Sequence, residues 1–165
     1  MITLEQLLHS CEHESNIIKH IATRLPANCL EYRPTEKQRT MLELMQYVTR
    51  ASAAPMCYAV DNTWDRGMVM HEGTSAVTAE NFADEMDAQM TMLRDEAGKL
   101  ADKPLDGPCM MPWREECTLG EFLVNAVLKA LTAYRMQFFL YAKAAGASEL
   151  STADCWIGKA APPQA

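Results

Sequence analysis

The sequence predicts an all-α protein, a four-helix bundle that fills residues 1–165 as a single domain. Capping motifs of the form Thr-x-x-Glu or Thr-x-x-Gln open long stretches in which apolar residues recur at helical spacing. No stretch shows the apolar/polar alternation of a half-buried strand. With 165 residues, 48% of them hydrophobic and 22% charged, the chain is large enough to bury one core.

The first helix is expected to begin after Thr3, which forms a capping box with Gln6, and to run to about Arg24, just before Pro26. Its apolar residues return to one side at helical spacing, as in a helix that packs on a core. These residues are Leu4, Leu7, Leu8, Cys11, Ile18, Ile21, Ala22 and Leu25.

Three histidines, His9, His13 and His20, fall on the opposite side of this helix, because steps of four and seven residues return to nearly the same angle. His9 and His13 have the i, i+4 spacing of a transition-metal chelate. A side without apolar residues is expected to face solvent. We therefore interpret the pair as part of a solvated face, where metal binding would be adventitious rather than functional.

A second helix is predicted from the capping box of Thr40 and Glu43 to near Tyr58, with Pro55 as a point where it can bend. Residues 61–77 contain two glycines and show no period, which predicts a long loop. The apolar side of the second helix consists of Met41, Leu44, Met45, Val48 and Ala51, with Tyr47 at its edge.

Thr78 is expected to cap a third helix that carries a regular apolar repeat and a charged side. Residues 103–113 contain three prolines and a glycine, which predicts a connection. The apolar repeat of the third helix is Phe82, Met86, Met90, Leu93, Ala97 and Leu100.

The longest predicted helix spans residues 118–146. Thr118 forms a capping box with Glu121, Lys143 lies in the last turn, and Gly146 tolerates a left-handed conformation just past the end. The apolar stripe is wide, so this helix is expected to be buried on two sides. The stripe consists of Leu119, Phe122, Leu123, Ala126, Val127, Ala130, Tyr134, Gln137 and Tyr141, and it is widened by Val124, Leu128, Leu131 and Phe138.

The wide apolar surface of the fourth helix favours self-association into a homodimer, because a monomer would otherwise expose it. The competing account is a cover formed by the segment after Gly146, where Trp156 is expected to pack back on the bundle. Residues 158–165 are expected to form a frayed tail.

Composition opposes two classes of partner. A formal net charge of -7 without a Lys/Arg run opposes binding to nucleic-acid phosphates. No signal-peptide pattern and no run of about 20 apolar residues is evident, so we expect a cytoplasmic protein without a membrane partner.

The six cysteines are scattered, with no C-x-x-C pair and no zinc-like spacing, so they are interpreted as reduced thiols. Several of them are expected to be small core residues. Cys57 near the end of the second helix is a candidate nucleophile, but no histidine is close to it in sequence to act as its base. The cysteines are Cys11, Cys29, Cys57, Cys109, Cys117 and Cys155.

Several motifs occur in order along nearly the whole chain. They are Glu31-Tyr-Arg-Pro34 and Arg39-Thr-Met-Leu-Glu-Leu before and into the second helix, Thr118-Leu-Gly-Glu-Phe-Leu and Tyr134-Arg-Met-Gln137 in the fourth, and Ala145-Gly146 followed by Glu149-Leu-Ser-Thr-Ala-Asp-Cys-Trp156. Together they resemble the DinB-like superfamily, also described as YfiT-like. The resemblance implies a four-helix bundle, often a homodimer, that holds zinc or nickel between helices. Some members are thiol-dependent transferases or isomerases.

The resemblance also implies three metal ligands: a His seven residues after the second-helix cap, and a His-x-x-x-His or Glu-x-x-x-His pair before Arg-x-Gln in the fourth helix. Those positions fall on Tyr47, Ala130 and Tyr134, and Gln137 ends the Arg-x-Gln. Alanine cannot bind a metal, and tyrosine binds one only as a phenolate, which is costly at its ordinary pKa of about 10. The chain is therefore expected to have a family pocket at these four positions without a metal or cofactor.

Two interpretations of Tyr47 and Tyr134 are compatible with the sequence. Their rings can face each other and fill the volume of a metal, with the hydroxyls linked through water or Gln137. Alternatively, both are amphipathic core residues with a polar tip. Arg135, next to Tyr134, is expected to pair with an acidic helix neighbour in a structural role.

Two functions remain as hypotheses, and whether the chain is an enzyme stays open. The first is a metal-free, homodimeric bundle that binds a small ligand or a protein partner. The alternative is a metal-dependent thiol S-transferase or isomerase that holds zinc or nickel through non-standard ligands, such as His71 with a carboxylate, or works without metal. His71 lies in the predicted loop, either on the surface or over a pocket.

Overall fold

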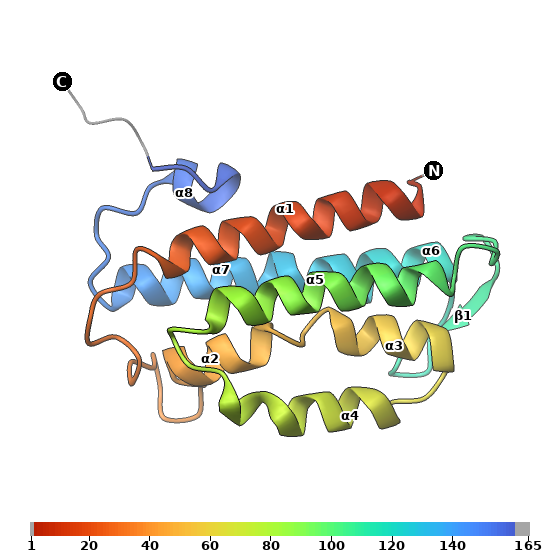
Figure 1. Ribbon diagram of the computed structural model, residues 1–165, viewed down its shortest axis with the longest axis horizontal. Coiled ribbons are helices and arrows are strands. Elements are labelled where there is room, and N and C mark those ends of the chain that lie inside the picture. Colours follow the sequence, from red (N-terminus) through yellow and green to blue (C-terminus); the bar gives the residue numbers. More distant parts are fainter. Residues whose placement is uncertain (1, 161–165) are drawn as a thin grey trace.

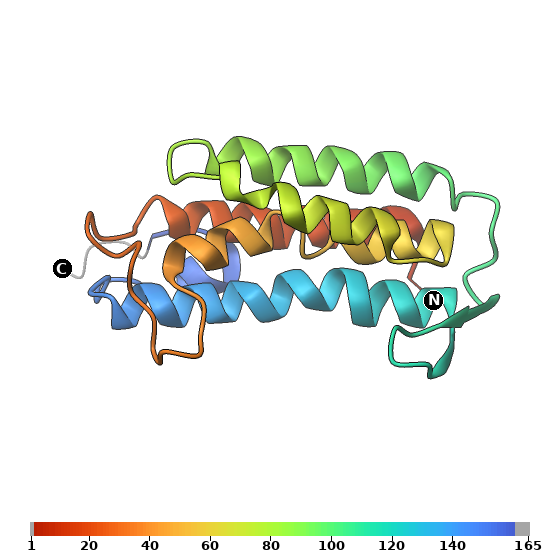
Figure 2. The same cartoon turned by 90° about the horizontal axis from the view of Figure 1, so that it is seen from below.

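The computed structural model describes residues 2–160, which form a mainly-α protein with a two-stranded antiparallel sheet. α1, α5 and a long helix built from α6, η2 and α7 run side by side, and α2 and α3 follow each other beneath α5 (Figure 1, Figure 2). None of the helices in this described part is long and apolar enough to cross a membrane. In chain order the elements are α1 (Leu4–Ala22), α2 (Met41–Val48), α3 (Ala53–Asp61), α4 (Asp65–Glu72), η1 (Gly73–Ala76), α5 (Phe82–Gly98), β1 (Pro108–Met110), β2 (Glu116–Thr118), α6 (Leu119–Phe122), η2 (Leu123–Leu128), α7 (Lys129–Ala144) and α8 (Thr152–Ile157).

The three predicted capping boxes are confirmed. The hydroxyls of Thr3, Thr40 and Thr118 accept hydrogen bonds from the backbone N–H three residues later, at 3.1, 3.1 and 3.2 Å. In each box the Gln or Glu side chain accepts the threonine N–H in return. These local bonds satisfy backbone groups that the first helical turn leaves unpaired.

The start of α5 differs from the prediction. Thr78 does not cap the helix directly, because Asn81 is the N-cap and α5 begins at Phe82. Instead Thr78 and Asn81 bond each other across the preceding turn, with the Thr78 N–H donating to Asn81 Oδ1 at 2.7 Å. The predicted motif closes a turn that leads into the helix.

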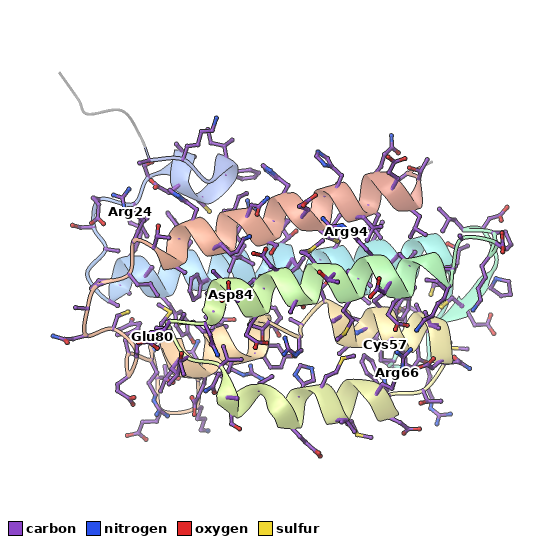
Figure 3. The ribbon with its side chains drawn as sticks, viewed as in Figure 1. Arg24, Cys57, Arg66, Glu80, Asp84 and Arg94 are labelled. Carbon is purple, nitrogen blue, oxygen red and sulfur yellow. The ribbon has the colours of Figure 1, made fainter. Side chains whose placement is uncertain are left out.

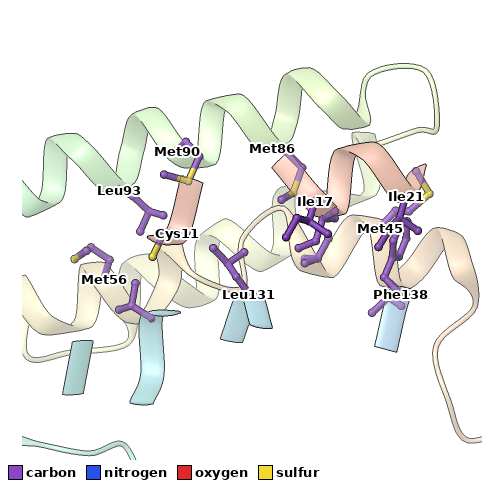
Figure 4. Close-up of a cluster of buried hydrophobic side chains, with 14 of the residues drawn as sticks. Cys11, Ile17, Ile21, Met45, Met56, Met86, Met90, Leu93, Leu131 and Phe138 are labelled. Carbon is purple, nitrogen blue, oxygen red and sulfur yellow. The ribbon is translucent and has the colours of Figure 1, made fainter. Parts of the chain in front are cut away.

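The core lies between α1, α2, α3, α5 and the long C-terminal helix (Figure 4). Apolar side chains from these helices interdigitate there, and the predicted core sides of the first three helices are confirmed in outline. Burying one large apolar side chain stabilises the fold by about 1.5–3 kcal/mol. The bulkiest side chains less than 2% exposed include Phe82, Phe122, Phe138, Leu7, Ile17, Ile18, Ile21, Met41, Leu44, Met45, Met56 and Met86.

The predicted second helix is broken into two. α2 ends at Val48 and α3 starts at Ala53, so a continuous helix to Tyr58 with a bend at Pro55 is wrong. Pro55 lies in the first turn of α3. Backbone N–H groups in a first turn make no hydrogen bond within the helix, so a proline without this group is tolerated there.

Gln89 of α5 satisfies the backbone at this break. Its Oε1 accepts the N–H groups of Ser52 and Ala53 at 3.0 and 3.3 Å, and its Nε2 donates to the Val48 carbonyl at 3.0 Å. The Gln89 side chain is 1% exposed. One buried amide therefore replaces bonds that a continuous helix would have made.

The long C-terminal helix contains a π-helical segment, η2, opposite this break. The hydroxyl of Ser52 donates to the Val127 carbonyl inside η2 at 2.9 Å. Beyond η2 the buried side chains of α7 are Leu131, Arg135, Phe138, Tyr141 and Ala142. Several residues of the predicted stripe are only half-buried: Ala126, Ala130, Tyr134 and Gln137.

The predicted loop over residues 61–77 is wrong, because the helix α4 and the 3-10 turn η1 form there. In α4 only Gly67 is buried, whereas Met68 and Val69 are 58% and 67% exposed, so the segment shows no apolar period. A Cβ at Gly67 would lie 3.3 Å from the Ala54 methyl and 3.1 Å from the ring of Trp64. This glycine lets α4 approach α3 closely.

An ion-pair network fixes α4 to its neighbours. Arg66 donates to both carboxylate oxygens of Glu96 on α5, at 2.7 and 2.8 Å, and also pairs with Asp61. Hydrogen bonds from Arg66 and Lys99 lower the pKa of Glu96 to about 2. Figure 3 shows Arg66 beside Cys57 at this end of the molecule.

A short hairpin lies within the predicted connection. β1 and β2 pair antiparallel with Cys109 opposite Cys117. Arg114 in its turn has a positive φ of 68°. Strands of three residues are too short to show an alternating pattern, so the expectation of a chain without strands missed them.

α8 packs on the histidine side of α1, so part of that side is covered. His20 is half-buried with Nε2 2.8 Å from Asp154 Oδ1, whereas His9 and His13 are exposed as predicted. Asp154 and Cys155 point inward. Trp156, which was expected to pack, is 58% exposed.

The predicted frayed tail over residues 158–165 lies mostly outside the described part of the chain, which ends at residue 160. Within that part, Gly158 ends α8 in a left-handed conformation with a φ of 61°.

Candidate functional site

Three aromatic side chains from three helices meet at one place. Tyr47 of α2 and Tyr134 of α7 contact edge to face, with ring centroids 5.0 Å apart. His71 of α4 stacks on Tyr47 at 4.9 Å with the planes 12° apart. The segment predicted as a loop therefore delivers His71 to the two tyrosines. We call Tyr47, His71 and Tyr134 the aromatic cluster.

The other two predicted pocket residues contribute less. Ala130 lies one turn before Tyr134 on α7 and is half-buried. The amide of Gln137 donates to the Tyr141 hydroxyl at 3.0 Å. The Gln137 amide thus bonds Tyr141 in this structure, and a link between the hydroxyls of Tyr47 and Tyr134 through water stays a prediction.

Tyr134 is held as a neutral phenol. Burial, followed by hydrogen bonding to Tyr47, raises the pKa of Tyr134 to about 12. Both effects disfavour the phenolate. Tyr134 is therefore a weak candidate for a metal ligand or a base at neutral pH.

Two arginines give the aromatic cluster a positive environment. The guanidinium of Arg39 lies 3.9 Å from the ring centroid of Tyr47, a cation–π contact. Arg50 is bound by Glu85 at 2.6 Å. Burial first, and then the charges of Arg39 and Arg50, lower the pKa of His71. The site keeps His71 neutral next to a fixed positive charge.

Part of the free energy of unfolding that the protein loses in acid is expected to come from protonation of His71. His71→Gln should remove that part of the loss. The unfolded chain, with a reference His pKa of about 6.5, binds this proton more readily than the folded chain. The stabilisation from neutral His71 is therefore complete above about pH 6.5 and decreases as the pH falls through the lower folded-state pKa.

Urea unfolding of the wild type and His71→Gln between about pH 8 and pH 5 measures this effect. The difference in their free energies of unfolding should be constant near pH 8. Below about pH 6.5 the wild type should lose more stability than His71→Gln. A difference that is the same at every pH would contradict a lowered pKa for His71. The exposed His9, changed to Gln, is the matched control.

The donor set of the aromatic cluster does not suit a divalent metal. It offers one imidazole and two tyrosines, and Arg39 adds a cation. Zinc and nickel need several imidazole, thiolate or carboxylate ligands. Across residues 2–160, no group of three His, Cys, Asp or Glu side chains is placed to hold a metal ion.

Cys57 lacks the environment of an activated nucleophile. It is fully buried on α3, and burial is the main cause of its raised pKa. Charged groups near Cys57 belong to the network of Arg66 and Glu96. The charge of Arg66 lowers the pKa of Cys57, but by less than burial raises it. A buried thiol of this kind is inert.

No local sequence pattern points to Arg39 or Arg50 as members of the site. Arg39 belongs to the motif before the second helix, and its contact with Tyr47 depends on how residues 23–40 fold back on α2. Searches against protein-family models, curated proteins and solved structures found no match.

Proposed function

We propose that this chain is a DinB-like four-helix bundle in which the aromatic cluster takes the place of the family's metal, and that it binds a small organic anion. The observation that carries the proposal is the contact of Tyr47 with Tyr134, at the two positions where the resemblance expects ligands. His71 stacks on the same ring. The proposed four-helix fold is supported by four helical segments. The first is α1, the second is α2 followed by α3, the third is α5, and the fourth runs from α6 through α7.

The charge of the site favours an anion. Arg39 is exposed, and none of the direct ion pairs among residues 2–160 includes it. A guanidinium binds a carboxylate through paired hydrogen bonds. The half-buried rings of Tyr47 and His71 lie next to Arg39 and supply aromatic surface for a flat ring. An aromatic carboxylate matches both features.

The binding experiment uses benzoate, with benzamide as a neutral probe of the same shape. Benzoate is expected to raise the melting temperature in proportion to its concentration, because a ligand that binds only the folded state stabilises it. Arg39→Gln should abolish the shift. The matched control is Arg33→Gln, an exposed arginine of the same segment, which should leave the shift intact. Equal shifts with benzamide would contradict an anion site.

The metal expectation is tested on untagged protein by elemental mass spectrometry, alongside a His9→Ala/His13→Ala variant. The proposal expects no zinc or nickel, or metal that disappears with the surface pair. About one metal ion per chain retained in the variant would overturn the metal-free bundle.

The alternative function, a thiol S-transferase or isomerase with non-standard ligands, is favoured by the delivery of His71 to the two tyrosines. Retained metal that is lost in His71→Ala would support it. Metal that survives this change would require other ligands.

The homodimer is also part of the proposal. Exposed apolar side chains on α7 and α8 supply a surface for it: Met136, Leu140, Trp156 and Ile157. The packing of α8 on α1 is the competing account, since it covers apolar surface within one chain. Light scattering on the same preparations should give the mass of two chains, and the mass of one chain would overturn the dimer.

A further inference from the structure

Cys109 and Cys117 lie directly opposite each other in the hairpin of β1 and β2. Backbone hydrogen bonds join Gly107 to Leu119 and Met111 to Glu115, two residues on either side of the cysteines. In an antiparallel ladder this alternation places the cysteines at a hydrogen-bonded pair, with Cα atoms roughly 5.5 Å apart. Disulfides span Cα separations of about 4.4–6.8 Å.

The two thiols are free and belong to directly paired residues. Both cysteines are half-buried, and neither is joined to another cysteine. Directly opposite residues point to the same face of a hairpin, so no change of register is needed to join the sulfurs.

The pair is also the accessible one. Both cysteines line an open cavity of about 710 Å³ at the hairpin end of the molecule, together with Lys103 and Glu121. The other four cysteines are at most 3% exposed: Cys11, Cys29, Cys57 and Cys155. A small thiol reagent in solution therefore reaches the hairpin pair first.

We propose that Cys109 and Cys117 form a reversible intramolecular disulfide by exchange with a low-molecular-weight disulfide such as oxidised glutathione. The thiolate of one cysteine attacks a glutathione sulfur, forms a mixed disulfide and releases one glutathione thiolate. The second cysteine then attacks the protein sulfur of the mixed disulfide and releases the second glutathione. The cysteines lose two protons and two electrons, and both pass to the two glutathione molecules.

The disulfide would form in the wall of the cavity. β2 runs directly into the Thr118 cap of the long C-terminal helix, so the bond would tie the start of that helix to β1. Burial, the neighbouring Cys109 and nearby glutamates raise the pKa of Cys117. Exchange is therefore slow at neutral pH, because the thiolate is the attacking species.

The test incubates the reduced full chain in glutathione buffers with an increasing share of oxidised glutathione. Free thiols are then blocked, and the protein is digested with trypsin. Cleavage after Arg114 separates the cysteines into peptides 100–114 and 115–129, each with a single cysteine. The proposal expects these two peptides to become cross-linked in most chains under oxidising buffer and to separate on addition of dithiothreitol.

Cys109→Ser and Cys117→Ser should each replace the cross-link by glutathione bound to the remaining cysteine. Cys57→Ser, which changes a buried thiol, should leave the cross-link unchanged. Three results would overturn the proposal: both peptides carrying only the blocking reagent in every buffer, glutathione on both cysteines of the wild type without a cross-link, or a cross-link to another cysteine. Because the wild type alone decides among them, a variant that fails to fold does not affect the test.

Discussion

Replacing Arg135 by methionine is expected to lower the free energy of unfolding by about 3–5 kcal/mol, because a buried charge would lose its partner. The side chain of Arg135 on α7 is 4% exposed, with Nε 2.9 Å from Oε2 of Glu14 on α1, whose side chain is 14% exposed. This contact is an ion pair without good hydrogen-bond angles, while Nη1 donates to the Cys155 carbonyl at 2.7 Å. Arg135 thus links α1, α7 and α8.

The matched control is Arg94→Met. Arg94 pairs with Glu12 of α1 at 2.6 Å, but both side chains are close to half exposed, at 47% and 45%. Exposed pairs of this kind contribute about 0–1 kcal/mol. Urea unfolding of both variants gives the comparison. Equal losses would show that burial of the Arg135 pair is unimportant.

The pair can also be removed as a whole. Arg135→Met combined with Glu14→Gln should recover part of the lost stability, because no unpaired carboxylate then remains. Burial already raises the pKa of Glu14, and the Arg135 charge opposes that rise. If the double variant is no more stable than Arg135→Met, the lost stability comes from the packing of the Arg135 side chain and not from an unpaired Glu14.

Replacing Gln89 by methionine is expected to lower the free energy of unfolding by about 3–5 kcal/mol, since each buried polar group left without a partner costs roughly 1–3 kcal/mol. Methionine has a similar length but bonds neither the N–H groups of Ser52 and Ala53 nor the Val48 carbonyl. The loss falls at the break between α2 and α3. Amide exchange at Ser52 and Ala53 should therefore accelerate more than elsewhere in the core.

Gln46→Met is the control for this change. The half-buried amide of Gln46 makes a single bond, to the Val77 carbonyl at 3.1 Å, so its loss should cost only about 1 kcal/mol. If Gln89→Met costs no more than Gln46→Met, the amide of Gln89 does not hold the break together.

Sequence reasoning succeeded where structure depends on nearby residues. The capping boxes at Thr3, Thr40 and Thr118 each involve residues three apart, and all were predicted. It failed where distant residues decide. The break after Val48 depends on Gln89, and α4 depends on the pairing of Arg66 with Glu96 thirty positions later.

The same limit applies to the candidate site. Tyr47 and Tyr134 were singled out through the resemblance, and their contact occurs in the structure. The position of His71 could not be predicted, because an exposed helix such as α4 carries no apolar stripe to identify it. The contribution of Arg39 depends on a segment without regular structure, for which local patterns predict little.

The π-helical segment η2 determines the direction in which each later side chain of the long C-terminal helix points. Each residue advances a regular helix by about 100°, and the wide turn of η2 accommodates one residue more than an α-helical turn does. If the same residues formed a regular α-helix through η2, each later position would be filled by the preceding residue in the chain. Tyr134 would take the place of Arg135 and leave Glu14 unpaired, and Ala133 would take the place of Tyr134, beside Tyr47. One extra residue in one turn thus decides which side chains of α7 form the core and which meet the aromatic cluster.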